Sequence, residues 1–175
     1  MKHNFTILFM VAVMLLGCGN KKKKREYYIQ RHELAAKYNA LTENSDLDGY
    51  VYQLQKKIVN GNKLLCFPAD VKELSRNDST CTLRLKLWKS EEDRYYVADL
   101  KVSTDVADRL NEQLQNKEKE QAGTFLFHVS QINLDEGQAT SSTNEEGDTY
   151  DYDVLIVRFK GELIDFFIYN KKADK

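Results

Sequence analysis

This chain of 175 residues carries only three histidines and three cysteines, so few imidazole or thiol groups are available for acid–base, nucleophilic or metal chemistry. His128 alternates with Phe127 and Val129, which predicts a strand residue on the opposite face from both neighbours. His32 lies in a segment with helical spacing. The sequence contains no local motif of a serine nucleophile elbow, a zinc-protease helix, a P-loop or a dinucleotide fingerprint. We therefore expect no enzyme, no catalytic residues and no cofactor.

Acidic residues gather in one segment, 135–153, and no Lys or Arg occurs between Val129 and Val157. Carboxylates on one loop suit a hard cation such as Ca²⁺, and Asp148, Asp151 and Asp153 are the candidate ligands. The ligand spacing of an EF-hand is missing, so we predict a solvated loop rather than a metal site.

The opposite charge appears on one stripe of an alternating segment, where Arg84, Lys86 and Trp88 share the outward face. Tyr95 on the following segment is expected to face the same way. Basic residues beside aromatics suit a protein interface, sugar stacking or nucleic-acid stacking, and a mixed solvent-exposed face is the alternative. The 26 basic residues are balanced by 27 acidic ones, so there is no overall positive field to hold nucleic acid.

Cys66 and Cys81 are far apart in the sequence and form no CxxC pair, so neither a redox motif nor a zinc knuckle is predicted. In an oxidising compartment the two could form a disulfide. If segment 75–79 is a tight turn, however, Cys81 lies opposite Val71 to Leu74 rather than Cys66. The sequence thus leaves two alternatives for these cysteines: a disulfide between them, or two small buried core residues.

The first eighteen residues have the pattern of an export signal. Lys2 and His3 precede an apolar run, Phe5 to Leu16, which is too short to span a bilayer. The sequence Leu15-Leu16-Gly17-Cys18 resembles the lipobox of bacterial lipoproteins. The resemblance implies cleavage before Cys18 and acylation of that residue by fatty acids such as palmitate. Such acyl chains would hold the protein permanently in a membrane.

The resemblance also implies a location. Gly19 is not the Asp that retains some lipoproteins in the inner membrane, so we expect the outer membrane. A basic run, 21–25, follows Cys18, and this favours the periplasmic face over the cell surface. The same run would meet anionic headgroups or act as a solvated tether. Four parts are predicted: a signal peptide, 1–17; a lipidated basic tether, 18–26; an N-terminal helix, 27–46; and a single β-rich domain, 47–175.

Hydrophobic periodicity predicts the elements of that domain. A helix is expected within 25–44, segment 50–59 is ambiguous between helix and strand, and a second helix is expected over 103–117. The predicted strands are 63–74, with an edge or bulge at Pro68, then 81–87, 94–102, 124–134, 154–159 and 163–169. The last two would be joined by a turn at 160–162, and segment 135–153 would be a long loop.

The predicted order places a helix between the third and fourth strands, which resembles an OB-fold, here a mainly β five- or six-stranded barrel with an N-terminal helix. The alternative is an α+β arrangement, a helix on an antiparallel meander. We predict a non-catalytic binding or assembly module for an envelope partner, without nucleic acid. A glycan-binding lipoprotein, using Trp88 with Tyr95 and Tyr96, is the alternative, and an envelope hydrolase without a recognisable motif is the third.

Overall fold

The computed structural model describes residues 26–77, 80–91, 94–114, 121–137, 140–143, 149–152 and 154–169. The predicted signal peptide, Cys18 and most of the basic tether therefore lie outside the described residues. In chain order the elements are an N-terminal helix, 26–38, then η1 (Asn44–Leu47), α2 (Val51–Leu54), η2 (Gln55–Val59), β1 (Leu64–Asn77), β2 (Thr80–Glu91), β3 (Arg94–Val102), α3 (Thr104–Leu114), β4 (Ala122–Glu136), β5 (Thr140–Thr143), β6 (Thr149–Tyr152) and β7 (Leu155–Ile168).

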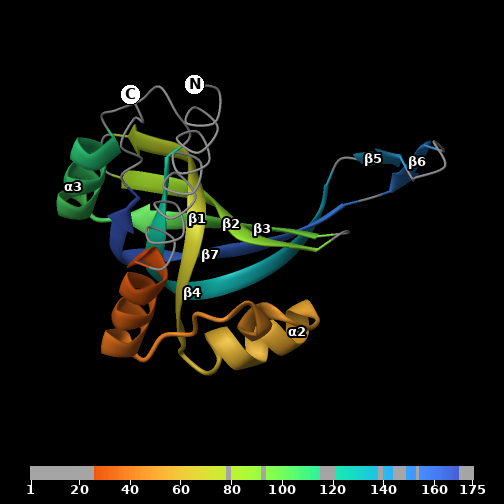
Figure 1. Cartoon of the computed structure of the whole chain (residues 1–175), viewed down its shortest axis with the longest axis horizontal. Helices are drawn as coiled ribbons and strands as arrows, with labels where there is room; N and C mark the ends of the chain where they lie inside the picture. Colours follow the sequence, from red (N-terminus) through yellow and green to blue (C-terminus); the bar gives the residue numbers. More distant parts are fainter. Residues whose placement is uncertain are drawn as a thin grey trace, which may run out of the picture.

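Five strands form one mixed sheet that closes into a ring in the order β1-β2-β3-β7-β4 (Figure 1). The β3–β7 pair is parallel, and the other four pairs are antiparallel. With β7 as the fifth strand and α3 between the third and fourth, this is the strand order of an OB-fold, as predicted. The alternative of an antiparallel meander is wrong, because β3 and β7 run parallel and β4 returns to β1.

The expected turn at 160–162 is wrong, because β7 runs continuously through Gly161. A Cβ atom at this position would lie 1.8 Å from the carbonyl oxygen of His128 on β4. Only glycine lets the two backbones approach so closely, and β4 has a bulge beside this point, between Val129 and Gln131. The glycine therefore marks a close approach within one strand, and the predicted sixth strand is the second half of β7.

Side chains fill the inside of the ring. On β2, Cys81, Leu83, Leu85 and Leu87 are buried and the residues between them are exposed, as the period of two predicted. The largest fully buried aromatic side chains come from four of the five strands: Phe67, Tyr96, Phe125, Phe127 and Phe159. The interior is therefore a packed hydrophobic core, which leaves the outer surface to carry any binding site.

The ambiguous segment 50–59 is helical, as α2 and the π-helical turn η2. Leu54 and Ile58 are fully buried in the core of the ring. The side chain of Gln55 accepts a hydrogen bond from the backbone N–H of Ile132, at 3.2 Å. This bond lies next to the bulge in β4, so the helical segment supports the strand where its regular pairing is interrupted.

The N-terminal helix packs on the ring and ends earlier than predicted. Asn39 follows the helix with a φ of +51°, a left-handed conformation that commonly ends helices. Ala35 is buried in a small cluster with Cys66 and Leu126, on the outer side of β1 and β4. The helix is therefore part of the folded domain.

Both described cysteines are free and buried, so the disulfide left open by the sequence is not formed. The predicted turn over 75–79 is too long, because Ser75 still pairs with Thr82 in the β1–β2 ladder. This register places Cys81 opposite Arg76, whereas Cys66 lies under the N-terminal helix. Burial raises the pKa of the Cys66 thiol to about 12, so it remains protonated at neutral pH.

The long acidic segment is not an unstructured loop throughout. Asp135 belongs to β4, and β5 and β6 form a two-stranded hairpin that projects from the ring (Figure 1). The candidate cation ligand Asp151 lies in β6, and Asp148 and Asp153 are outside the described residues. The sequence did not indicate these two strands by hydrophobicity, because β5 consists of Thr and Ser and β6 of Thr, Tyr and Asp.

Gly161→Ala tests the close approach of β4 and β7. The added methyl group would collide with a backbone carbonyl that cannot rotate away, and we expect a loss of about 1–3 kcal/mol in the free energy of unfolding. Urea denaturation of the purified chain measures it. Glu162→Ala, at the neighbouring exposed position, should change stability by less than about 0.5 kcal/mol. Equal stability of both variants would show that the ring does not depend on this contact.

Candidate functional site

The four residues predicted for binding lie together on the outer face of β2 and β3. Lys86 places its ammonium 4.7 Å from the centre of the Tyr95 ring. Trp88 is 50% exposed, and its indole N–H donates to a carboxylate oxygen of Asp70 at 2.9 Å. Arg84 donates from Nε to Asp99 at 2.8 Å. The structure thus brings all four onto one surface, each already held by a neighbour.

Arg84 has a second role, as a member of a row of charges that crosses every strand of the ring. The row, called here the charge ladder, consists of Glu73 on β1, Arg84 on β2, Asp99 on β3, Arg158 on β7 and Asp135 on β4. Signs alternate along it, and its closest contacts are 2.6 Å, from Arg158 to both Asp99 and Asp135. Arg84 is therefore committed to the ring and is less available to a partner than the sequence suggested.

Asp99 is the central carboxylate of the charge ladder. Burial raises its pKa, but hydrogen bonds and charges from Arg84 and Arg158 outweigh burial and hold the pKa below its usual value. A carboxylate with a lowered folded-state pKa stabilises the fold above its unfolded pKa, and that contribution is lost as the pH falls through the folded value. The charge ladder should therefore weaken in acid.

Trp88 leads into an aromatic cluster that sequence reasoning missed. Its ring lies 5.6 Å from that of Tyr169, just after β7, and Tyr169 stacks on Tyr27 of the N-terminal helix at 4.3 Å. Phe167 lies 5.5 Å from the same tyrosine. The Tyr169 hydroxyl is 2.5 Å from the hydroxyl of Thr124, and burial raises its pKa. The aromatic cluster, Tyr27, Trp88, Phe167 and Tyr169, thus joins the β2–β3 face to the start of the helix.

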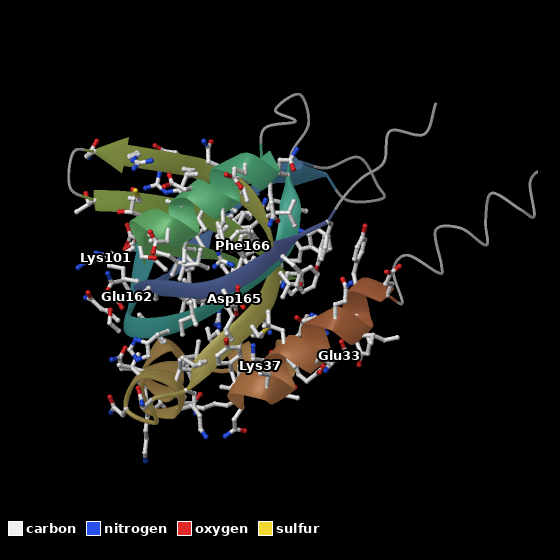
Figure 2. All side chains as sticks on the ribbon, turned by 90° about the vertical axis from the view of Figure 1, so that its left-hand side faces the viewer. Glu33, Lys37, Lys101, Glu162, Asp165 and Phe166 are labelled. Carbon is white, nitrogen blue, oxygen red and sulfur yellow. The ribbon has the colours of Figure 1, made fainter. Side chains whose placement is uncertain are left out.

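Beyond the aromatic cluster lies a groove of about 860 Å³ between the N-terminal helix and the end of β7. Figure 2 shows the helix in orange and α3 in green on either side of β7, with Glu33 and Lys37 on the helix and Asp165 and Phe166 on the strand. The complete lining is Glu26, Tyr27, Gln30, Glu33, Leu34, Lys37, Asp165, Phe166, Phe167 and Ile168. Its walls thus combine aromatic and aliphatic side chains with charged ones, of which three are acidic and one is basic.

A second polar group lies at the end of the β2–β3 hairpin, around the buried Lys89, whose side chain is only 7% exposed. Its ammonium donates to the carbonyl of Asn44 at 2.9 Å, lies 3.2 Å from Glu91 and contacts the carboxylate of Asp48. Tyr96 is fully buried and donates its hydroxyl to Glu91 at 3.0 Å; burial raises its pKa to about 12. The group fastens η1 to the ring.

This arrangement corrects one detail of the glycan hypothesis. Tyr95 faces outward beside Lys86, whereas Tyr96 points into the core, so the two tyrosines cannot form one stacking surface. Strict alternation along β3 already implied opposite faces. A sequence signal for the Lys89 group also existed, since Lys89 continues the inward series of Cys81, Leu83, Leu85 and Leu87.

The two described histidines, His32 and His128, lie apart from these surfaces. His128 Nε2 is 3.0 Å from the side-chain oxygen of Asn62, and His32 lies 3.4 Å from Glu43. Within the described residues, no three His, Cys, Asp or Glu side chains are grouped so as to hold a metal ion.

No protein-family model, curated protein or solved structure matches the chain. None of the helices in the described ranges is both long enough and apolar enough to cross a membrane. Any functional conclusion therefore depends on the residues themselves.

Asp99→Asn tests the charge ladder. The amide cannot accept two charge-assisted hydrogen bonds, so we expect a loss of about 1–3 kcal/mol in the free energy of unfolding at pH 7. The difference from the unaltered chain should shrink as the pH falls towards 3, because this carboxyl takes up a proton more readily in the unfolded chain than in the fold, where its pKa is lowered. Urea denaturation at both pH values measures this, with the exposed Asp105→Asn as control. A difference independent of pH would contradict the assigned role.

Lys89→Met tests the fastening of η1. We expect the amides of Asp46 and Asp48, which bond to Glu43 and Ser45 in the turn, to exchange with deuterium at least tenfold faster. Global stability should change little, because methionine fills the buried site and the two carboxylates left behind, Asp48 and Glu91, remain partly exposed to water. Lys63→Met, at a less buried site outside this group, is the control. Unchanged exchange in η1 would show that Lys89 does not hold it.

Proposed function

We propose that this chain is a lipid-anchored protein of the outer membrane, facing the periplasm, that binds a partner protein and performs no chemistry. The partner would contact the outer face of β2 and β3 around Trp88. Attachment to the membrane would rest on acylation of Cys18, and the following basic residues, 21–25, would contact anionic headgroups.

The observation that carries the proposal is the state of Trp88. Its indole is half-exposed, yet its orientation is fixed by the hydrogen bond to Asp70 and by the contact with Tyr169. Tryptophan, tyrosine and arginine dominate binding energy in protein interfaces. A side chain ordered before binding loses little conformational entropy when the partner arrives. Lys86, held over Tyr95, adds a second ordered contact.

The N-terminal helix supports a position close to the membrane. Tyr27, at its start, stacks on Tyr169 and so joins the helix to the ring. Tyr27 lies nine positions after Cys18, and this length of chain can span at most about 30 Å when extended. An acylated Cys18 would therefore keep the aromatic cluster and Trp88 near the membrane surface. Confinement to that layer raises the local concentration, so even a weak interface could be occupied.

A second candidate function, glycan binding, is favoured by a different observation. Tyr50 and Tyr52 are 65% and 69% exposed, and their rings lie 6.1 Å apart with planes only 9° from parallel. Exposed parallel aromatic rings suit stacking on sugars. The glycan site would then lie at the start of α2 and not on the Tyr95 and Tyr96 pair.

Photocrosslinking in intact cells tests the proposal. Benzoylphenylalanine replaces Trp88 in one variant and Tyr52 in another, and envelope extracts are analysed by mass spectrometry. We expect one discrete protein adduct from position 88 and none from position 52. Lys86→Glu should lower the yield from position 88 at least fivefold, because it reverses a charge beside the contact. Lys160→Glu makes the same change on β7 and should leave the yield unaltered.

Three results would contradict the proposal. They are the absence of a protein adduct from position 88, equal yields from positions 88 and 52, and equal effects of the two Lys→Glu changes. Glycan-bearing adducts from position 52 would support the second candidate instead.

A further inference from the structure

We infer that the groove between the N-terminal helix and β7 binds a basic, partly apolar peptide segment of the same partner. This inference rests on the proposed function and names the chemistry of the partner. The groove has the volume of a ligand site, about 860 Å³, and presents both apolar and polar side chains.

Charge is the first argument for a basic occupant. Glu26, Glu33 and Asp165 line the groove, and Lys37 is its one basic lining residue. The Lys37 ammonium lies over the ring of Tyr38, 5.0 Å from its centre. In the described part of the chain neither Glu26 nor Glu33 forms an ion pair, whereas the carboxylates of the charge ladder all do. Among the described residues, Glu26 and Glu33 are therefore carboxylates of the groove without an ion pair.

Arg109 of α3 already shows how the edge of the groove receives a cation. Its guanidinium lies 5.5 Å from the centre of the Phe166 ring and 3.8 Å from a carboxylate oxygen of Asp165. A carboxylate beside an aromatic face attracts a cation through charge and through the ring quadrupole. Glu26, Tyr27 and Glu33 line the same groove from the helix side.

The apolar part of the lining favours a ligand with apolar groups over a simple cation. Leu34, Phe167 and Ile168 would contact the aliphatic stems of lysine or arginine and an apolar residue between them. Phosphate-bearing ligands, including anionic headgroups and nucleic acid, would be repelled by Glu26 and Glu33. A basic peptide satisfies both the charge and the apolar surface.

The aromatic cluster makes the groove continuous with the proposed partner face. Tyr169 contacts Trp88 on one side and both Tyr27 and Phe167, which line the groove, on the other. One partner could therefore contact Trp88 and extend a basic segment along the helix.

The test uses the full chain in a zwitterionic detergent and a fluorescein-labelled peptide of alternating lysine and leucine. Binding is followed by fluorescence anisotropy. We expect saturable binding that Glu26→Gln with Glu33→Gln weakens at least tenfold. Glu112→Gln with Glu136→Gln removes the same charge at exposed positions outside the groove lining and should change the Kd by less than twofold. Unchanged melting temperatures would show that all variants fold.

Absence of saturable binding, or equal weakening by both double variants, would overturn the inference. The photocrosslink from position 88 separates this failure from failure of the proposed function. If peptide binding is absent but the adduct still forms normally in the Glu26→Gln, Glu33→Gln variant, only the inference about the groove is contradicted. Groove-dependent peptide binding without any adduct from position 88 removes the partner face around Trp88.

Discussion

The closed ring depends on β7, a single uninterrupted strand that lies between β3 and β4 and pairs with both. Its first half pairs in parallel with β3, and nearly its whole length pairs with β4. Both pairings are possible because Gly161 lets the backbone of β7 contact the carbonyl of His128. Once the ring is closed, the end of β7 lies beside the N-terminal helix. Phe167 and Tyr169 are thereby placed between the helix and Trp88.

The charge ladder follows the same closure. Its five residues come one from each strand, so the row can exist only when β3, β7 and β4 are neighbours. Asp99 and Arg158 are the members with the least exposed side chains and lie at the parallel pair. The charges of the ladder thus hold strands together. We propose that Glu26 and Glu33 of the N-terminal helix contact a partner instead.

Local patterns predicted much of the fold, because they need only nearby residues. The alternation from Cys81 to Leu87 placed the four apolar inward residues of β2, though not Lys89, and the helix between the third and fourth strands led to the OB-like order. The prediction of a turn at 160–162 was wrong because a glycine between polar residues is typical of a turn, and the sequence does not show that another backbone approaches it closely. The β5–β6 hairpin was not predicted because β5 consists only of Thr and Ser and β6 carries no aliphatic residue.

The same limit applies to the candidate site: contacts within one strand could be predicted from the sequence, and contacts between distant segments could not. Arg84, Lys86 and Trp88 share a face by periodicity alone, whereas Tyr27 and Tyr169 meet only after the ring closes. The sequence ending in Cys18 that resembles a lipobox is a local pattern, whereas the acids of the groove come together only through tertiary packing.

Trp88 is the chain's only tryptophan, so a single ¹⁹F resonance reports on the proposed partner face once the chain carries 5-fluorotryptophan. The most direct measurement adds solubilised envelope extract, from cells lacking the chain, to the labelled protein. The account predicts that this resonance shifts or broadens with the extract and recovers when extract proteins are digested beforehand. A sharp resonance at an unchanged position, at every extract concentration, would contradict a protein partner at Trp88.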